Sequence, residues 1–418
     1  MSVLSLRYAL KTLVGPWVML PVAGLEVMNF LQRGMPWRGE SLWTVDWFAI
    51  ALFIVGPLLA GAAAVDASRL SRPGNIHLVL ATSRPHRPYF RAAAWCALPV
   101  LGVHLLTIAT GIAVGGVHGT PAWFGLAGAV LVQCLAICWY VAIGSAIGRL
   151  TSPLLAGAIA AIGAFTFIYL LGEGSSGRFE PLSLGGATVS RLGYQYSAGY
   201  LLAQIAVFAI TGAALLLLPI CQRSGRVIPT RIGASAMALI ALIALGGQYA
   251  LPDQRLIAKA ETPTDCTDAE PTVCLYPEHQ RFQDQAVGHV RTLTKAARAR
   301  GYDALVPKRV EELSRTYRVT SPDIAGLEIS ADAYATGKVT LEEVASGLVR
   351  PLHCAGLYEG RGPGPKYWQR EFSLYATLLH TADIKVDPRE FPEPAKILTP
   401  KEVQDIRADY AACKLEGQ

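Results

Sequence analysis

Residues 123–147 read WFGLAGAVLVQCLAICWYVAIGSAI and contain no charged side chain. An α-helix rises about 1.5 Å per residue, so roughly 20 apolar residues are enough to cross the hydrocarbon layer of a bilayer. This stretch is therefore predicted to be a membrane-spanning helix, which places the chain among membrane proteins.

Six further apolar stretches are of similar length, and together they predict an α-helical polytopic bundle of about seven spans: 13–31, 46–66, 93–116, 154–172, 198–220 and 232–251. The first of these is interrupted by Pro16, Pro21 and Glu26. A cleaved signal peptide is the alternative interpretation of it. We favour a span, because no Ala-x-Ala cleavage site follows.

The charged residues divide the chain into two domains. Of 418 residues only 16% are charged, against roughly 25% in soluble proteins. Residues 1–251 hold 15 of the 37 basic and 6 of the 31 acidic side chains. We therefore expect a transmembrane domain over 1–251 and a water-soluble domain over 252–418. The net charge of +6 does not indicate a nucleic-acid partner, because the basic surplus lies beside apolar spans.

Basic residues at the ends of the spans predict the orientation, since Lys and Arg are enriched in cytoplasmic loops. With the N-terminus inside, eleven basic residues of 1–251 fall on the inner side and four on the outer side, which are Arg33, Arg38, Arg178 and Arg191. The sequence thus predicts a bacterial cell-membrane protein with a cytoplasmic N-terminus and an extracytoplasmic C-terminal domain. Trp37, Trp43 and Trp47 near one outer boundary, and Trp123 near another, fit an interfacial aromatic belt.

Four of the eight cysteines lie in the C-terminal domain, at Cys266, Cys274, Cys354 and Cys413. An even number of cysteines in an oxidising compartment indicates disulfides. Of the three possible connectivities, the preferred one pairs Cys266 with Cys274 and Cys354 with Cys413. A zinc site is the alternative, although the close Cys-x-x-Cys pairs of zinc modules are missing.

The C-terminal domain is predicted to be α+β. Thr272–Tyr276 is typical of a strand, whereas 283–300 and 366–380 carry apolar stripes at helical spacing. Two further helices are expected to begin with capping boxes, Thr340 with Glu343 and Thr399 with Glu402. Tyr276-Pro277-Glu278-His279 is interpreted as a polar turn after the strand. No catalytic motif is present, so we expect no enzyme activity, metal site or bound cofactor on this chain.

The inner segment 66–91 carries the functional signal and reads DASRLSRPGNIHLVLATSRPHRPYFR. Its Pro73-Gly74 pair ends any helix that continues from the second span. The apolar run 76–81 is expected to form a short helix on the membrane surface. The basic cluster after it would face phospholipid head groups or a cytoplasmic partner.

Leu78-Val79-Leu80-Ala81-Thr82-Ser83-Arg84 resembles the coupling-helix motif of permease subunits of ABC-2-type ATP-driven exporters. The resemblance covers residues 1–220. An amphipathic stretch before the first span, at 5–11, and a long outer segment, at 173–197, agree with it. It implies a loop that docks on an ABC-type ATPase subunit and comprises Arg72, Ile76, His77, Leu78, Leu80, Thr82, Arg84 and Arg87. It further implies a dimer of permease subunits.

Two departures from the family separate this chain from its usual members. Arg72-Pro73-Gly74-Asn75 replaces the acidic residues that precede the motif, and a seventh span and a large C-terminal domain are added. No Walker-type phosphate loop occurs, so ATP is expected on a separate chain. Three alternatives remain open. In the first, the loop is only a positive-inside anchor. In the second, the protein is a membrane sensor or assembly protein that displays a binding domain, and in the third it is an intramembrane or extracytoplasmic enzyme.

Two ionisable groups, Glu26 and His104, lie within predicted spans, where such residues are costly and often functional. We expect Glu26 to reach water at the outer interface and His104 to form a hydrogen bond to a neighbouring helix. The run of small residues at 156–164 permits close packing, either between helices of one chain or between subunits.

Overall fold

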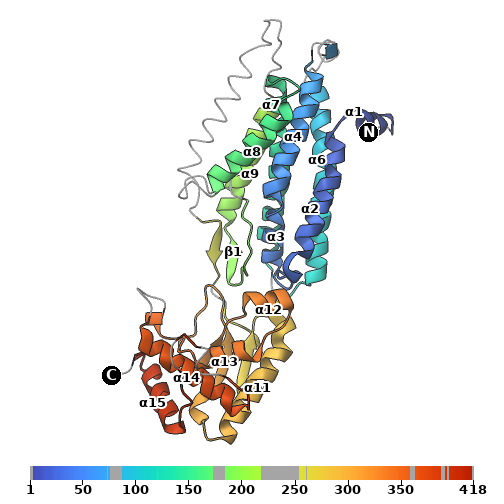
Figure 1. Cartoon of the computed structure of the whole chain (residues 1–418). Coiled ribbons are helices and arrows are strands. Elements are labelled where there is room, and N and C mark those ends of the chain that lie inside the picture. The colour runs from blue at the N-terminus through green and yellow to red at the C-terminus, as the bar shows by residue number, and fades with distance from the viewer. Residues whose placement is uncertain are drawn as a thin grey trace.

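The computed structural model describes residues 3–72, 74–75, 87–119, 121–172, 184–217, 254–259, 261–357, 363–386, 391–392 and 395–416. Within these residues the protein is mostly helical and has two parts stacked end to end (Figure 1). One is a bundle of long helices. The other is a mixed α/β unit, which we call the C-terminal domain.

Four helices among the described residues are long and apolar enough to cross a membrane: α4 (Leu52–Leu70), α6 (Arg87–Gly115), α7 (Trp123–Leu150) and α9 (Ala198–Leu216). Each overlaps a predicted span, although α4 ends after residue 66 and α6 begins before residue 93. The first and fifth predicted spans correspond to shorter helices, α2 (Met19–Leu31) and α8 (Ala156–Gly172). The predicted second span is divided into α3 (Ser41–Ala49) and α4. The predicted span 232–251 lies outside the described residues.

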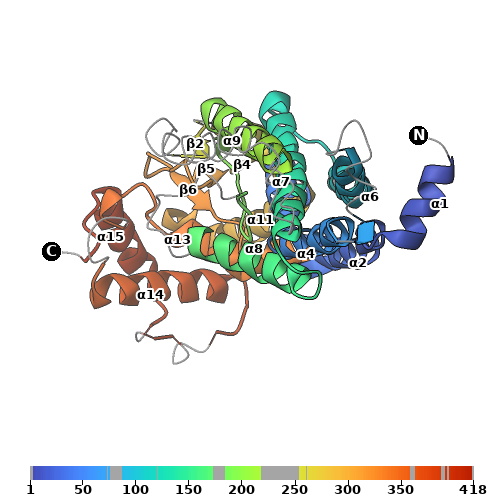
Figure 2. The ribbon, with the colours of Figure 1, turned by 90° about the horizontal axis from the view of Figure 1, so that it is seen from above.

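Glycines let the bundle helices approach closely. A Cβ atom added to Gly144 of α7 would lie 2.0 Å from the carbonyl oxygen of Ala60 on α4, and one on Gly148 would lie 2.2 Å from that of Ala64. Without side chains at these positions, the two backbones are in direct contact. α4 therefore takes the centre of the bundle, between α6, α7 and α8 (Figure 2).

The small-residue run of α8 packs within the chain. Ala156, Ala160 and Ala164 are buried, whereas Ile159 and Ile162 are 45% and 66% exposed. On the inner side, a Cβ on Gly61 of α4 would lie 3.2 Å from the Gly157 carbonyl oxygen. The small residues thus form an interface between helices of one chain, and the larger apolar side chains point outward.

The C-terminal domain is built on a four-stranded sheet of β3 (Asp265–Cys266), β4 (Thr272–Leu275), β5 (Arg309–Glu312) and β6 (Ile324–Leu327), in that order. β3 and β4 are antiparallel, and β4, β5 and β6 are parallel. The helices of this domain are α11 (Gln283–Ala299), α12 (Ala331–Thr336), α13 (Leu341–Val349), α14 (Pro365–Thr381) and α15 (Pro400–Ala411). The predicted strand and two predicted helices are confirmed as β4, α11 and α14.

Local sequence signals in this domain have the expected structure. Both capping boxes are present, with Thr340 and Thr399 each accepting a hydrogen bond from the backbone of the glutamate three residues on. The preferred disulfides, Cys266–Cys274 and Cys354–Cys413, are both formed. His353 lies beside the second disulfide, but the two sulfur atoms are bonded to each other, so this group does not match a zinc site.

A two-stranded sheet links the two parts of the molecule. β1 (Tyr194–Tyr196) precedes α9, and β2 (Leu256–Ala258) precedes the C-terminal domain. They pair antiparallel, with Tyr194 opposite Ala258 and Tyr196 opposite Leu256. We call the region around this sheet and the N-terminus of α3 the junction.

Candidate functional site

Three acid–base residues that are distant in sequence meet at the junction. Glu40 comes directly before α3, His279 lies in the 3-10 turn after β4, and Glu312 ends β5. β4 and β5 are parallel neighbours, with Cys274 opposite Glu311. The chain that leaves β4 therefore passes beside the end of β5, at the edge of the sheet that faces the bundle. We call these three residues the His279 cluster.

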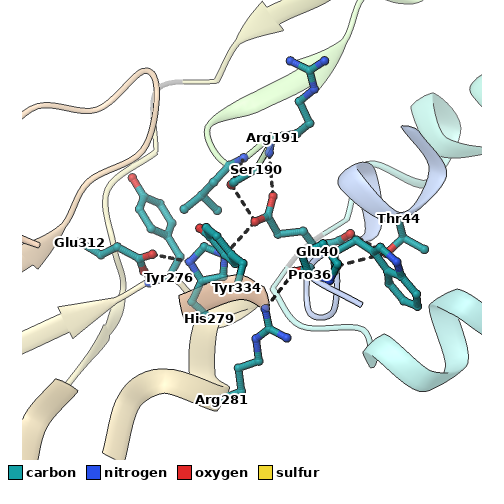
Figure 3. Close-up of polar contacts among 12 residues, drawn as sticks. Pro36, Glu40, Thr44, Ser190, Arg191, Tyr276, His279, Arg281, Glu312 and Tyr334 are labelled. Carbon is teal, nitrogen blue, oxygen red and sulfur yellow. Dashed lines mark hydrogen bonds and ion pairs between the residues drawn. The ribbon is translucent and has the colours of Figure 1, made fainter. Parts of the chain in front are cut away.

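His279 joins a carboxylate from each part of the molecule. Its Nε2 atom lies 2.8 Å from Oε1 of Glu40, and its Nδ1 atom is in close contact with Oε1 of Glu312 (Figure 3). The three side chains are at most 4% exposed. All three side chains are thus shielded from water, at a contact between the bundle and the C-terminal domain.

Further donors hold both carboxylates in place. Glu40 accepts hydrogen bonds from the Ser190 hydroxyl at 2.7 Å and from the Arg191 backbone N–H at 2.9 Å. Glu312 accepts one from the Tyr276 backbone N–H at 2.9 Å. Each carboxylate is therefore oriented by its own side of the junction before it meets the imidazole ring.

The two carboxylates keep His279 protonated. Burial alone lowers the pKa of the ring, but the charges and hydrogen bonds of Glu312 and Glu40 outweigh it and raise the pKa to about 10. At neutral pH the ring is therefore an imidazolium, with both nitrogens donating. Because this charge pairs with two carboxylates, the cluster acts as an ionic link rather than as a general base.

A second buried cluster surrounds Asp46 of α3, whose side chain is fully buried. Arg255 donates to its Oδ1 atom at 2.5 Å, and the Tyr196 hydroxyl donates to the same oxygen at 2.8 Å. The Arg191 guanidinium forms an ion pair at 3.4 Å. Since Arg191 also bonds to Glu40 through its backbone, it connects the two clusters.

Buried ion pairs of this kind make the junction hard to open. Removing one partner of such a pair typically costs about 3–5 kcal/mol, because an unpaired charge is left in the interior. The geometry therefore supports a C-terminal domain that is fixed to α3 and moves with it.

Inside the bundle, Glu26 and His104 are paired. Nδ1 of His104 lies 2.7 Å from Oε1 of Glu26, and Nε2 lies 2.9 Å from Oε1 of Gln133. The expected hydrogen bond from His104 to a neighbouring helix is confirmed. The expectation that Glu26 reaches water is wrong: its side chain is 1% exposed, because α2 packs with this face against α6.

The opposite end of the bundle holds α1 (Val3–Thr12), which extends away from the other helices (Figure 2). Asp66, near the end of α4, accepts hydrogen bonds from the backbone N–H groups of Val14 and Gly15, both at 2.8 Å. Arg69 donates to the Thr12 carbonyl at 3.3 Å. We call this region the α1 end.

Two of the residues assigned to the ATPase-docking loop lie at the α1 end. Arg72 follows α4, and Arg87 begins α6, and both are exposed. The other members, Ile76, His77, Leu78, Leu80, Thr82 and Arg84, lie outside the described residues. Within the described chain, the loop leaves and re-enters the bundle far from the C-terminal domain (Figure 1).

The predicted aromatic belt is wrong for three of its four members. Trp37, Trp43 and Trp47 are at most 1% exposed. The Trp43 ring stacks edge-on against Tyr334 of α12 at 5.1 Å, and Trp47 donates to the Asn29 carbonyl at 2.8 Å. These indoles fill the junction, whereas Trp123 is 55% exposed.

Sequence reasoning did not find the His279 cluster. It interprets residues 276–279 as a polar turn after the strand and gives His279 no partner. Glu40 and His279 are 239 residues apart, and no spacing pattern connects positions on different domains. A histidine close to the end of a buried strand was the available signal.

Comparisons with known proteins do not assign the chain to a family: no family profile matches it, and no curated protein or solved structure is similar to it.

Proposed function

We propose that the protein is the membrane permease subunit of an ATP-driven exporter of the ABC-2 type, energised by a separate ATPase that docks on the 66–91 loop. The observation that carries this proposal is the placement of α1, the end of α4 and the start of α6 at one end of the bundle, with the C-terminal domain at the other (Figure 1). A docking loop and an extracytoplasmic domain need this separation.

The charge distribution supports the same orientation. Exposed basic side chains at the α1 end include Arg7, Lys11, Arg69, Arg72, Arg87 and Arg91. Among the described residues of this end, Asp66 is the acidic one; it is buried and accepts hydrogen bonds from two backbone N–H groups. A net positive end is typical of the cytoplasmic side of a membrane protein.

Exposed apolar side chains on the outer surface of the bundle support a lipid or subunit contact. Leu106 on α6 is 68% exposed, Leu154 before α8 is 91% exposed and Leu202 on α9 is 66% exposed. Apolar surface of this extent is unfavourable in water and favourable against acyl chains or a second permease subunit. In the proposed dimer, the rigid α4–α7 pair would rock together with the C-terminal domain.

Docking can be tested with Leu78→Asp. The full chain is purified from its own host in mild detergent, and co-purifying ATP hydrolysis is measured. We expect Leu78→Asp to abolish it, because buried apolar anchors carry most of the affinity of an interface. Arg84→Ala should weaken it less, and more visibly at low salt.

Ile397→Asp is the matched control, since it puts the same charge on a 41% exposed apolar side chain of the C-terminal domain. It should retain the ATPase. Absence of any ATPase from the wild-type preparation would overturn the permease proposal. Full ATPase recovery with Leu78→Asp would reduce the loop to a topological anchor.

A membrane sensor or assembly protein is the second candidate. The buried ionic junction favours it, because a rigid link suits transmission of a binding event from the C-terminal domain to α3. Two results together would favour this function. The wild-type protein would carry no ATPase, and the protease sensitivity of its α1 end would change when a ligand occupies the C-terminal domain.

A further inference from the structure

A cavity of about 480 Å³ opens at the junction, next to the His279 cluster. The bundle contributes Arg33 and Trp43 to its lining, and the segment 188–194 before α9 adds a second wall. The C-terminal domain contributes the segment 313–318 after β5 and residues 328–335. This volume lies in the range of small-molecule sites, roughly 300–1,000 Å³.

The lining carries a positive surplus. Three arginines, Arg33, Arg315 and Arg318, face one carboxylate, Glu328. Among the described residues, no carboxylate forms an ion pair with Arg33 or Arg315. Guanidinium groups bind phosphate and carboxylate with two parallel hydrogen bonds, so this set of charges favours an anion.

An apolar wall stands beside the arginines. It is formed by Trp43, Val189, Leu192, Leu313 and Ile329, of which Val189 offers most of the accessible apolar surface because it is 38% exposed and the others are at most 8% exposed. A small inorganic anion would leave the exposed part of this wall in contact with water. An anion that carries an apolar group would cover it, at roughly 25 cal/mol for each Å² removed from water.

The arginines come from both sides of the junction. Arg33 lies in the turn after α2 and has a left-handed backbone, with φ of 51°. Such a conformation costs about 1–3 kcal/mol in a non-glycine residue, and it recurs where a side chain must be aimed at a ligand. Arg315 follows β5 in the C-terminal domain, so arginines from both parts of the molecule line the same cavity.

We propose that this cavity binds an anionic amphiphile, with its phosphate or carboxylate group on Arg33 and Arg315 and its apolar part against Val189. The ligand can come from the bilayer, as the head group of an anionic lipid, or from solution, as a soluble amphiphile. The site does not depend on whether the chain is a permease.

The test uses the full chain in a neutral detergent and isothermal titration with dihexanoyl phosphatidic acid. Arg33→Gln and Arg315→Gln should each weaken binding about 10-fold or more, as expected for loss of a charged hydrogen-bonding group. Arg298→Gln, which removes an exposed arginine of α11 outside the cavity lining, should leave the affinity unchanged. Unchanged thermal unfolding of the variants shows that they are folded.

A second arm distinguishes the two sources. Protein from bilayer discs that contain phosphatidylglycerol and phosphatidylcholine is analysed by native mass spectrometry. If the ligand is a lipid, the wild-type protein should retain phosphatidylglycerol and Arg33→Gln should lose it. Binding of dihexanoyl phosphatidic acid without lipid retention assigns a soluble amphiphile. Equal affinity for inorganic phosphate or for dihexanoyl phosphatidylcholine, or unchanged binding in both cavity variants, would overturn the proposal.

Discussion

His279 separates two buried carboxylates that would otherwise face each other across the junction. The protonated ring of His279 is stabilised because Glu40 and Glu312, from different parts of the molecule, contact its two nitrogens. A second buried histidine, His104, bridges Glu26 and Gln133 inside the bundle. Neither ring is exposed to solvent, so both serve as connectors between chain segments.

Replacing His279 with Gln should destabilise the protein by about 3–5 kcal/mol, because the neutral amide leaves two carboxylates buried without a counter-charge. Thermal unfolding of the full chain in detergent measures the loss. His380→Gln is the control, since His380 is exposed at the end of α14, and it should shift stability by less than about 0.5 kcal/mol. Equal effects of the two variants would contradict the ionic link.

Stability should also decrease with pH between about 6.5 and 10. The folded pKa of His279 is raised from 6.5 to about 10, so its contribution is complete below pH 6.5. As pH rises, the unfolded chain releases the proton first, and the contribution is lost when pH passes the folded pKa. Unfolding profiles of wild type and His279→Gln should converge at high pH. Parallel profiles would rule out a protonated ring.

In the bundle, His104→Leu should cost about 1–3 kcal/mol, because it leaves the Glu26 and Gln133 side chains buried without their partner. Glu26→Gln keeps a hydrogen-bonding group of the same size next to the ring, and we expect a smaller loss. Tryptophan fluorescence during thermal unfolding in detergent compares the two. A larger loss for Glu26→Gln would show that the charge of Glu26, rather than the hydrogen bond, matters.

At the scale of the elements, the contact between α4 and α7 shows how small residues determine helix spacing. Gly144 and Gly148 lie one turn apart and face the backbone of α4. Side chains at these positions would have to displace main-chain atoms, which cannot move as a flexible side chain can. Close packing and van der Waals contact therefore stabilise this pair.

Gly144→Ala should separate α4 from α7 and destabilise the bundle by about 1–3 kcal/mol, as overpacking does in protein cores. Gly163→Ala on α8 is the matched control, because a Cβ there has no atom within 4 Å. That variant should be neutral or slightly stabilising, since alanine favours helix. Thermal unfolding in detergent gives both values, and equal destabilisation would contradict the role of the close contact.

At the scale of the whole molecule, the junction makes the bundle and the C-terminal domain one mechanical unit. Two ionic clusters, the Trp43–Tyr334 ring contact and the β1–β2 pair all connect them. A movement of α3 would therefore be carried into the C-terminal domain. The cavity lies in this same contact, where an occupant touches both parts.

The orientation of the molecule can be measured directly. We expect a C-terminal epitope to be removed when protease is added to intact spheroplasts, and an N-terminal epitope to be protected until the membrane is permeabilised. The reason is the concentration of exposed basic residues at the α1 end. Protection of the C-terminal epitope would reverse the predicted topology.

Much of this protein followed from its sequence alone, where the cause is local. Apolar length predicted the four long helices, cysteine placement predicted both disulfide pairs, and three-residue spacing predicted the capping boxes at Thr340 and Thr399. The long helices and the capping boxes depend on residues close in sequence, as does the Cys266–Cys274 pair, whereas Cys354 reaches Cys413, 59 residues on, only in the folded domain.

The tertiary structure alone decided what the polar and aromatic residues of the junction do. Trp43 and Trp47 resemble interfacial tryptophans in sequence, yet both are buried, Trp43 against Tyr334 of the C-terminal domain and Trp47 against Asn29 of α2. In the bundle, Glu26 resembles a water-facing acid in sequence, but in the structure it pairs with His104 of α6. Glu40 meets His279 because the parallel strands β4 and β5 end on the side of the sheet that faces α3. Electrostatic contacts depend on distance in space, and positions 239 residues apart share no local pattern from which that distance can be predicted.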